Sequence, residues 1–198
     1  MTPARPLAGA AALALAAALS ACMTDPAADT RAYAAPGVGS AHQMTGVVPV
    51  AGLTAEAYVR NAAASDLFEI QSSQLALQRS QDPAVRRFAE TMIAHHTDTT
   101  RRLTEAARAA NMTPPAPMLT AEQTRMMQDL TRASAADFDR TYMTQQEAAH
   151  RVAWSIHAGY ARDGQSAPLR AVAANAVPIV EGHHHMAMTD GRVQAASR

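Results

Sequence analysis

The pattern of apolar and polar positions divides the chain at about residue 50. From Met23 to Val50 the sequence is rich in Ala, Pro, Gly, Thr and Asp and shows no apolar period, whereas long segments with helical start signals follow it. The composition of residues 22–50 predicts a flexible tether. Residues 51–198 are predicted to form one domain with a sizeable core.

Two long helices are predicted in the first half of this domain. Thr54 can cap a helix that runs through AEAYVRNAAASDLFEIQSSQLALQRS. Asp82 and Pro83 give a second start, with Asp as N-cap and Pro at the first helical position of PAVRRFAETMIAHHTDTTRRLTEAARAANM. The run TPPAP ends that helix because Pro cannot continue it.

Three further helical segments follow. Thr120 and Gln123 have the spacing of a capping box and open a short helix, AEQTRMMQDLTRA. Ser134 precedes a long helix through DFDRTYMTQQEAAHRVAWSIHAGYA, which the Asp-Gly pair at 163–164 ends. The last helical region begins near Ser166 and meets Pro178, which either kinks the helix or restarts it.

These segments predict an all-α fold. The sequence predicts four long helices and one short connecting helix, and it contains no convincing strand. This set of elements is typical of a four-helix bundle, here with a Pro-kinked last helix. The stretch from Met112 to Ser134 is long enough to cross the length of a bundle, so plain up-down topology is not the only option. Because aromatics make up only 4% of the chain, the core is expected to consist mainly of Ala, Leu, Val, Ile and the 11 Met.

Charge and motif content exclude several classes of function. All 17 basic residues are Arg and they balance 17 acidic residues, which gives no electrostatic reason to expect nucleic acid as a partner. The polar helix faces are mixed in charge rather than basic, which weighs against a membrane-surface role for the helices. The sequence has no phosphate-cradling glycine loop, no Gly-x-Ser-x-Gly and no catalytic cysteine.

The N-terminus is typical of an export signal. MTPARPLAGAAALALAAALSAC has a positive start at Arg5, an apolar run and a small-residue boundary, which predicts a signal peptide over residues 1–21. Leu19 to Cys22 resembles the bacterial lipobox, whose cysteine becomes the lipidated first residue, although a plain signal peptide with an incidental cysteine is the alternative. A lipidated Cys22 carries enough acyl chains for stable attachment. Met23 in place of Asp implies the periplasmic side of the outer membrane.

Four polar residues lie near the middle of the four long helices. Glu69 precedes the break after the first helix by roughly eleven residues and His96 follows it by roughly thirteen, so both lie about 15–20 Å from that turn. His150 and His183 flank the Asp-Gly break at similar distances. One carboxylate and three imidazoles at one depth are the layout of a metal or polar site inside a bundle.

Each of these residues also has a purely structural interpretation. Glu69 alone can point to solvent, and of the adjacent His95 and His96, about 100° apart on a helix, at most one faces inward. Glu147 and His150 share a face at i, i+3, which is the Glu-x-x-His spacing of di-iron bundles but is also common among surface pairs.

Three segments in order resemble the signatures of the domain-of-unknown-function family 4142, a ferritin-like bacterial family whose members are often exported. They are VRRFAETMIAHHTDTTRRL, ADFDRTYMTQQEAAH and VPIVEGHHHMA. The resemblance covers about residues 53 to 195, and Glu69 matches a Glu in the family's first helix. The other matching positions are Phe88, Ala89, Met92, His96, Phe138, Asp139, Tyr142, Gln146, His150, Pro178 and His183.

The resemblance also separates the three consecutive histidines of EGHHHMAM. His183 is the inward one, His184 stands at a position that is usually apolar and is expected to be partly buried, and His185 faces solvent. With Met188 at i+4, His184 can form a second, weaker soft-metal site. The family usually has Asp where this chain has His95, so an acidic position beside His96 is changed.

The predicted ligand set is rich in nitrogen. One Glu and three His suit Zn, Cu or mononuclear Fe better than a carboxylate-bridged di-iron pair, which needs a second Glu-x-x-His. We therefore expect a lipoprotein whose ferritin-like bundle binds a transition metal in order to handle or sense it in the periplasm. Enzymatic activity is left open: a di-iron oxidoreductase is a further alternative, but it requires more carboxylates than the sequence places. The alternative is a structural or interaction module in which the same residues form a buried hydrogen-bond network. The predicted ligands are Glu69, His96, His150 and His183, with Glu147, Gln146, His95 and His184 as their nearest polar partners.

Overall fold

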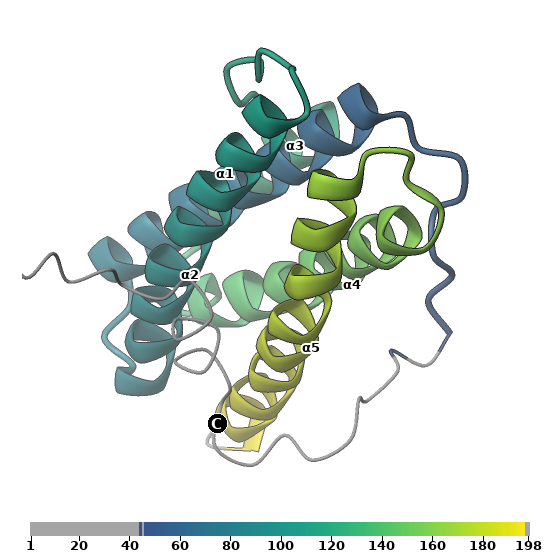
Figure 1. Cartoon of the computed structure of the whole chain (residues 1–198). Helices are drawn as coiled ribbons and strands as arrows, with labels where there is room; N and C mark the ends of the chain where they lie inside the picture. Colours follow the sequence, from purple (N-terminus) through teal and green to yellow (C-terminus); the bar gives the residue numbers. More distant parts are fainter. Residues whose placement is uncertain (1–43, 45, 197–198) are drawn as a thin grey trace, which may run out of the picture. The chain divides into compact units, whose positions relative to one another are not determined.

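The computed structural model describes residues 44 and 46–196, which belong to one compact unit spanning residues 34–198. These residues form five helices and no strand: α1 (Ala55–Arg79), α2 (Pro83–Ala109), α3 (Ala121–Arg132), α4 (Phe138–Asp163) and α5 (Ala167–Ala196) (Figure 1). The predicted all-α bundle with a short connecting helix is confirmed. No described helix is apolar over a length that could cross a membrane. The predicted signal peptide and Cys22 lie outside the described residues.

The predicted helix starts are confirmed by their caps. The Thr54 hydroxyl accepts a hydrogen bond from the Ala57 amide, and the Asp82 carboxylate accepts one from the Ala84 amide at 2.7 Å. The reciprocal bonds of the capping box that starts at Thr120 are both present. The start of α4 differs from the prediction, because Ser134 bonds Asp137 within a turn and the helix begins only at Phe138.

The last helix is continuous through Pro178, so the alternative of a restarted helix is wrong. Proline lacks the amide hydrogen that would bond the carbonyl of Ala174, four residues earlier. Both Pro178 and Ala174 are exposed. Solvent can therefore satisfy the orphaned carbonyl, which explains why a proline is tolerated at this position.

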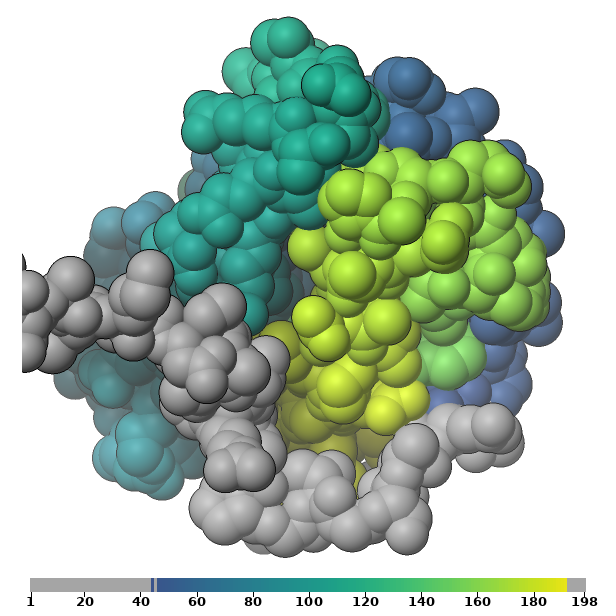
Figure 2. All heavy atoms as spheres, in the orientation of Figure 1, coloured from purple at the N-terminus to yellow at the C-terminus, as the bar shows by residue number. Residues whose placement is uncertain are grey.

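The four long helices form two antiparallel hairpins that pack side by side. α1 lies along α2 and α4 along α5, while α2 also contacts α5 and α1 also contacts α4 (Figure 1). Figure 2 shows the face on which α5 lies between α2 and α4. α3 contacts α1 and α4, and at its end the carbonyls of Leu130, Thr131 and Ala133 accept hydrogen bonds from Arg79 at the end of α1.

This contact places the start of α4 beside the end of α1, so the segment after α2 crosses the length of the bundle. Side-chain pairs along the two helices agree: Ser73 bonds Tyr142, and Tyr58 bonds His157 nearer the other end. α4 is therefore antiparallel to α1. One long crossover between two hairpins is the topology of ferritin-like folds.

A buried polar layer separates two apolar clusters along the bundle. One cluster includes Tyr58, Leu103 and Tyr160, and the other includes Phe88 and Phe138. Each long helix carries buried polar residues between its contributions to these clusters. They include Asp66, Glu69, Ser72, Ser73, His96, Gln146, His150 and His183.

The chain before α1 packs against the bundle, which differs from the predicted domain boundary at residue 51. Met44 is only 8% exposed and belongs to a cluster with Trp154 and Val180. The Val50 amide donates to the Ser155 carbonyl at 3.0 Å, and the Ser155 hydroxyl donates to the Val48 carbonyl. The packed domain therefore includes residues 44 and 46–50, which the sequence had placed in the tether.

Replacing Gly159 by alanine is expected to displace this segment. A methyl group at Gly159 would lie 1.9 Å from the Val50 carbonyl oxygen, so the backbone contact cannot survive. We expect a net destabilisation of about 1–2 kcal/mol in urea denaturation, together with faster proteolysis near Val50. Gly182→Ala is the matched control: it also lies within a helix, but its added methyl meets nothing within 4 Å. An equal response of both variants would contradict this packing.

Candidate metal centre

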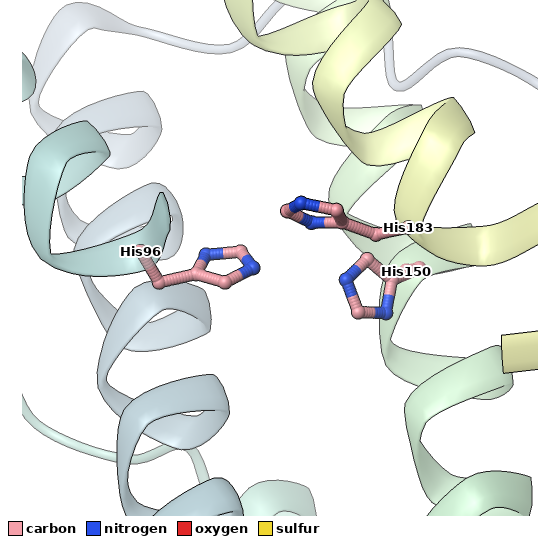
Figure 3. Close-up of side chains that lie close together, drawn as sticks. All are labelled: His96, His150 and His183. Carbon is pink, nitrogen blue, oxygen red and sulfur yellow. The ribbon is translucent and has the colours of Figure 1, made fainter. Parts of the chain in front are cut away.

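Three histidines from three helices converge in the polar layer. His96 comes from α2, His150 from α4 and His183 from α5, and their side chains point toward one another (Figure 3). One ring nitrogen of each lies within 4.8 Å of the other two. The three residues are 3%, 1% and 2% exposed, respectively. This spacing allows three imidazoles to bind one ion between them.

Each imidazole is held by one nitrogen and leaves the other unpaired. His96 Nδ1 bonds Asp66 Oδ1 at 2.8 Å, His150 Nδ1 bonds the Gln146 carbonyl at 2.7 Å, and His183 Nε2 bonds His95 Nδ1 at 2.7 Å. The remaining nitrogens, His96 Nε2, His150 Nε2 and His183 Nδ1, are buried and have no hydrogen-bond partner among the described residues. Metal-binding histidines are typically held in this way, with the second nitrogen fixing the tautomer and the orientation of the ring.

Glu69 lies beside the three histidines but does not join their group of nitrogens. It is 1% exposed, so the alternative that it points to solvent is wrong. Its Oε1 lies 3.9 Å from His150 Nδ1, and neither carboxylate oxygen accepts a hydrogen bond of normal geometry. Direct coordination by Glu69 stays a prediction.

Burial sets the protonation of the centre. It raises the pKa of Glu69 to about 7, against the lowering effects of His96 and Gln146. It lowers the pKa of His150 to about 3 and that of His183 well below its ordinary value. Burial also lowers the pKa of His96, but the bond to Asp66 and its charge outweigh this, so the net shift is upward. His150 and His183 are therefore neutral near pH 7, the state in which imidazole binds metal.

The predicted polar partners divide into two groups. Gln146 is fully buried, accepts from His150 through its carbonyl and donates to the Ser72 hydroxyl at 3.0 Å. His95 is half-buried yet bonds His183, so both His95 and His96 contact the centre and the rule that one must face away was too strict. Both Glu147 and His184 are half-buried and stay outside the group of three, and His185 is exposed.

Sequence inspection missed Asp66, which holds His96. Asp66 is 5% exposed and also accepts hydrogen bonds from the hydroxyls of Thr99 at 2.9 Å and Thr100 at 3.1 Å. The available signal was its position three residues before Glu69, which puts both carboxylates on one face of a helix. His157, buried and bonded to Tyr58, was also missed, although it lies two turns after His150.

His157 is expected to make the protein acid-sensitive. Burial lowers its pKa from 6.5 to about 4. Above pH 6.5 both folded and unfolded chains hold it neutral, whereas between pH 6.5 and 4 only the unfolded chain takes up the proton, which destabilises the fold by up to about 3 kcal/mol. Urea denaturation of metal-free protein between pH 7 and 4.5 measures this loss. His157→Asn should remove the part of the pH dependence that His157 contributes and leave the part due to buried His150 and His183, whereas the same change at exposed His185 should leave the dependence as in the unaltered protein.

The fold and the buried histidines define a helical bundle with a candidate metal centre. Residues 39–189 match the model of the family described as Domain of unknown function (DUF4142), and the chain belongs to this family. No curated protein matches the sequence.

Two solved structures share the fold. One is described as CopM in the Cu(II)-bound form, with a TM-score of 0.61 and 14% identity, covering 72% of this chain and 98% of that one. The other is a DUF305 fragment from Deinococcus radiodurans, with a TM-score of 0.60, 16% identity and the same coverage of 72% and 98%. At these identities the likeness shows the bundle fold alone.

Proposed function

We propose that this protein binds one transition-metal ion through His96 Nε2, His150 Nε2 and His183 Nδ1. The observation that carries the proposal is that one ring nitrogen of each histidine lies within 4.8 Å of the other two, while each ring has one anchored nitrogen and one that is buried and unpaired. Unpaired buried polar atoms are rare in folded proteins, and three that converge need a common explanation. A bound ion satisfies all three at once.

Copper is the first metal to test, followed by zinc and iron. Imidazole nitrogen suits all three ions. The structure of CopM, which shares this fold, carries Cu(II). The centre lies within the packed bundle, and none of its features requires a reaction. We therefore propose a role in holding or buffering metal rather than in catalysis.

The decisive measurement is the metal content of the untagged protein. After incubation with Cu, Zn, Fe or Mn and removal of loosely bound ions, elemental analysis should find about one ion per chain. Because binding to the folded state adds to stability, the loaded protein should unfold at a higher temperature than chelator-treated protein. Protein that stays metal-free with all four ions would contradict the proposal.

The alternative function is a structural module built on the same layer. Ser73 bonds Tyr142 at 2.7 Å, Gln146 bonds Ser72, and Asp66 bonds His96, so the layer contains a real hydrogen-bond network. Such networks can fix the register of helices. This alternative predicts no bound metal and a stability that chelators do not change, and it leaves the three unpaired nitrogens unexplained.

We further propose that Cys22 anchors the protein to the outer membrane, with the bundle on the periplasmic side. Cys22→Ser is expected to move the protein out of the membrane fraction, because the lipid supplies the attachment. Immunoblots of fractionated cells measure this shift. Met23→Ala, which changes the next residue but keeps the acceptor cysteine, is the control and should remain with the membranes. A Cys22→Ser variant that still sediments with the membranes would contradict the proposed lipid anchor.

A further inference from the structure

α1 contributes no histidine to the centre, but it brings two buried carboxylates beside it. Asp66 and Glu69 lie three residues apart and are 5% and 1% exposed. Each faces the Nδ1 atom of a different histidine: Asp66 Oδ1 lies 2.8 Å from His96 and Glu69 Oε1 lies 3.9 Å from His150. The helix thus lines one side of the centre with two acidic side chains.

Within the part of the chain that the structure describes, no arginine forms an ion pair with either carboxylate. The chain contains no lysine. Among the described residues, the ion-pair partners of Asp66 and Glu69 are His96 and His150, and both of these bind metal as neutral imidazoles. With both carboxylates ionised beside three neutral imidazoles, the centre carries a protein charge of minus two, which a bound cation can offset. A buried charge needs a compensating partner nearby.

Resting on the proposed function, we propose that Asp66 and Glu69 match the charge of a divalent ion and so select Cu(II) or Zn(II) over Cu(I). A divalent ion makes the centre neutral, whereas a monovalent ion leaves one negative charge buried. Asp66 acts through His96 and is held by the hydroxyls of Thr99 and Thr100. Glu69, whose oxygens have no normal hydrogen bond, supplies the second charge.

Copper offers the sharpest test because the same element can be supplied as a monovalent or as a divalent ion. The protein is loaded with one equivalent of copper. Its affinities for Cu(II) and for Cu(I) are then measured by competition with chelators of known strength. Glu69→Gln and Asp66→Asn each remove one charge with little change of shape. We expect the ratio of Cu(II) to Cu(I) affinity to fall at least tenfold in each variant. A tenfold fall raises the reduction potential of the bound copper by about 59 mV.

Glu90→Gln is the matched control. Glu90 is an exposed carboxylate on α2, about two turns before His96, and its loss should leave the affinity ratio within twofold of the unaltered protein. A role that is merely structural would weaken both oxidation states together and leave the ratio unchanged. If Asp66→Asn does not fold, Glu69→Gln alone decides the result, since Glu69 makes no normal hydrogen bond that the amide would lose.

The outcomes separate the two proposals. If the unaltered protein binds neither form of copper nor any other ion, the proposed function itself is overturned. If it binds copper but the Glu69→Gln ratio matches that of Glu90→Gln, metal binding stands and charge selection is overturned. A fall in the ratio confined to Glu69→Gln and Asp66→Asn supports both.

Discussion

Replacing His183 by alanine is expected to weaken metal binding at least about 100-fold, whereas replacing His185 should leave it unchanged. Loss of an outer hydrogen-bond partner alone typically costs 10–100-fold in affinity, and the loss of a ligand should cost at least as much. His183 belongs to the group of three histidines and its Nδ1 is buried and unpaired, while His185, two residues later on the same helix, is exposed. Competition with a coloured chelator measures both affinities.

The neighbouring histidines make this comparison stringent. A protein that bound metal only through its histidine-rich tract would lose similar affinity at His183, His184 and His185. The buried centre predicts instead that His96→Ala and His150→Ala, more than thirty residues away in sequence, resemble His183→Ala. Circular dichroism of each metal-free variant must first show an intact helical fold. Equal losses at His183 and His185 would contradict the centre.

The second large effect is expected at Arg79. Arg79→Ala should destabilise the protein by about 3 kcal/mol, because the guanidinium holds the junction between α3 and α4. It donates to three carbonyl oxygens at the end of α3 at 3.1, 3.0 and 2.6 Å and lies 4.5 Å above the Phe138 ring. Hydrogen bonds with a charged partner contribute about 1.5–3 kcal/mol each, and partial exposure of Arg79 reduces their sum.

Urea denaturation measures the loss of stability in Arg79→Ala, and two further variants serve as comparisons. Arg79→Lys keeps the charge but not the planar fork, so it should recover only part of the stability. Arg132→Ala removes an exposed arginine at the end of α3 and should change stability by only about 0.5 kcal/mol. Hydrogen exchange should also show faster opening of α3 in Arg79→Ala. If Arg79→Ala and Arg132→Ala cost the same, the guanidinium does not hold the junction.

The sequence predicted the depth of the centre because the rise of a helix is fixed. Counting residues from the breaks was enough to place Glu69, His96, His150 and His183 in one layer, and cap signals such as Asp82 fixed the starting points. What counting could not give was the rotation of α1. Only the packed bundle shows that Asp66 faces His96 and that Glu69 faces away from solvent.

Features that depend on contacts between distant segments escaped the sequence. The segment before α1 was predicted to be a tether because it is rich in Ala, Pro, Gly, Thr and Asp and has no apolar period, yet Gly159 gives its backbone room to lie against α4. His95 was expected to turn away from the centre because neighbouring side chains diverge. Its ring nevertheless reaches His183 from the edge of the interface between α2 and α5. Helix periodicity gives the direction in which each side chain leaves its own helix, but it does not give the distance to the neighbouring helix.

The distribution of the three histidines over the two hairpins has a kinetic consequence. His96 belongs to the α1–α2 hairpin, while His150 and His183 belong to the α4–α5 hairpin, and the crossover segment joins the two. An ion held by all three fastens one hairpin to the other, much as a cross-link closes a long loop. Its residence time then depends on how often the hairpins separate, so substitutions along their contact surface can change the rate of release without altering any ligand.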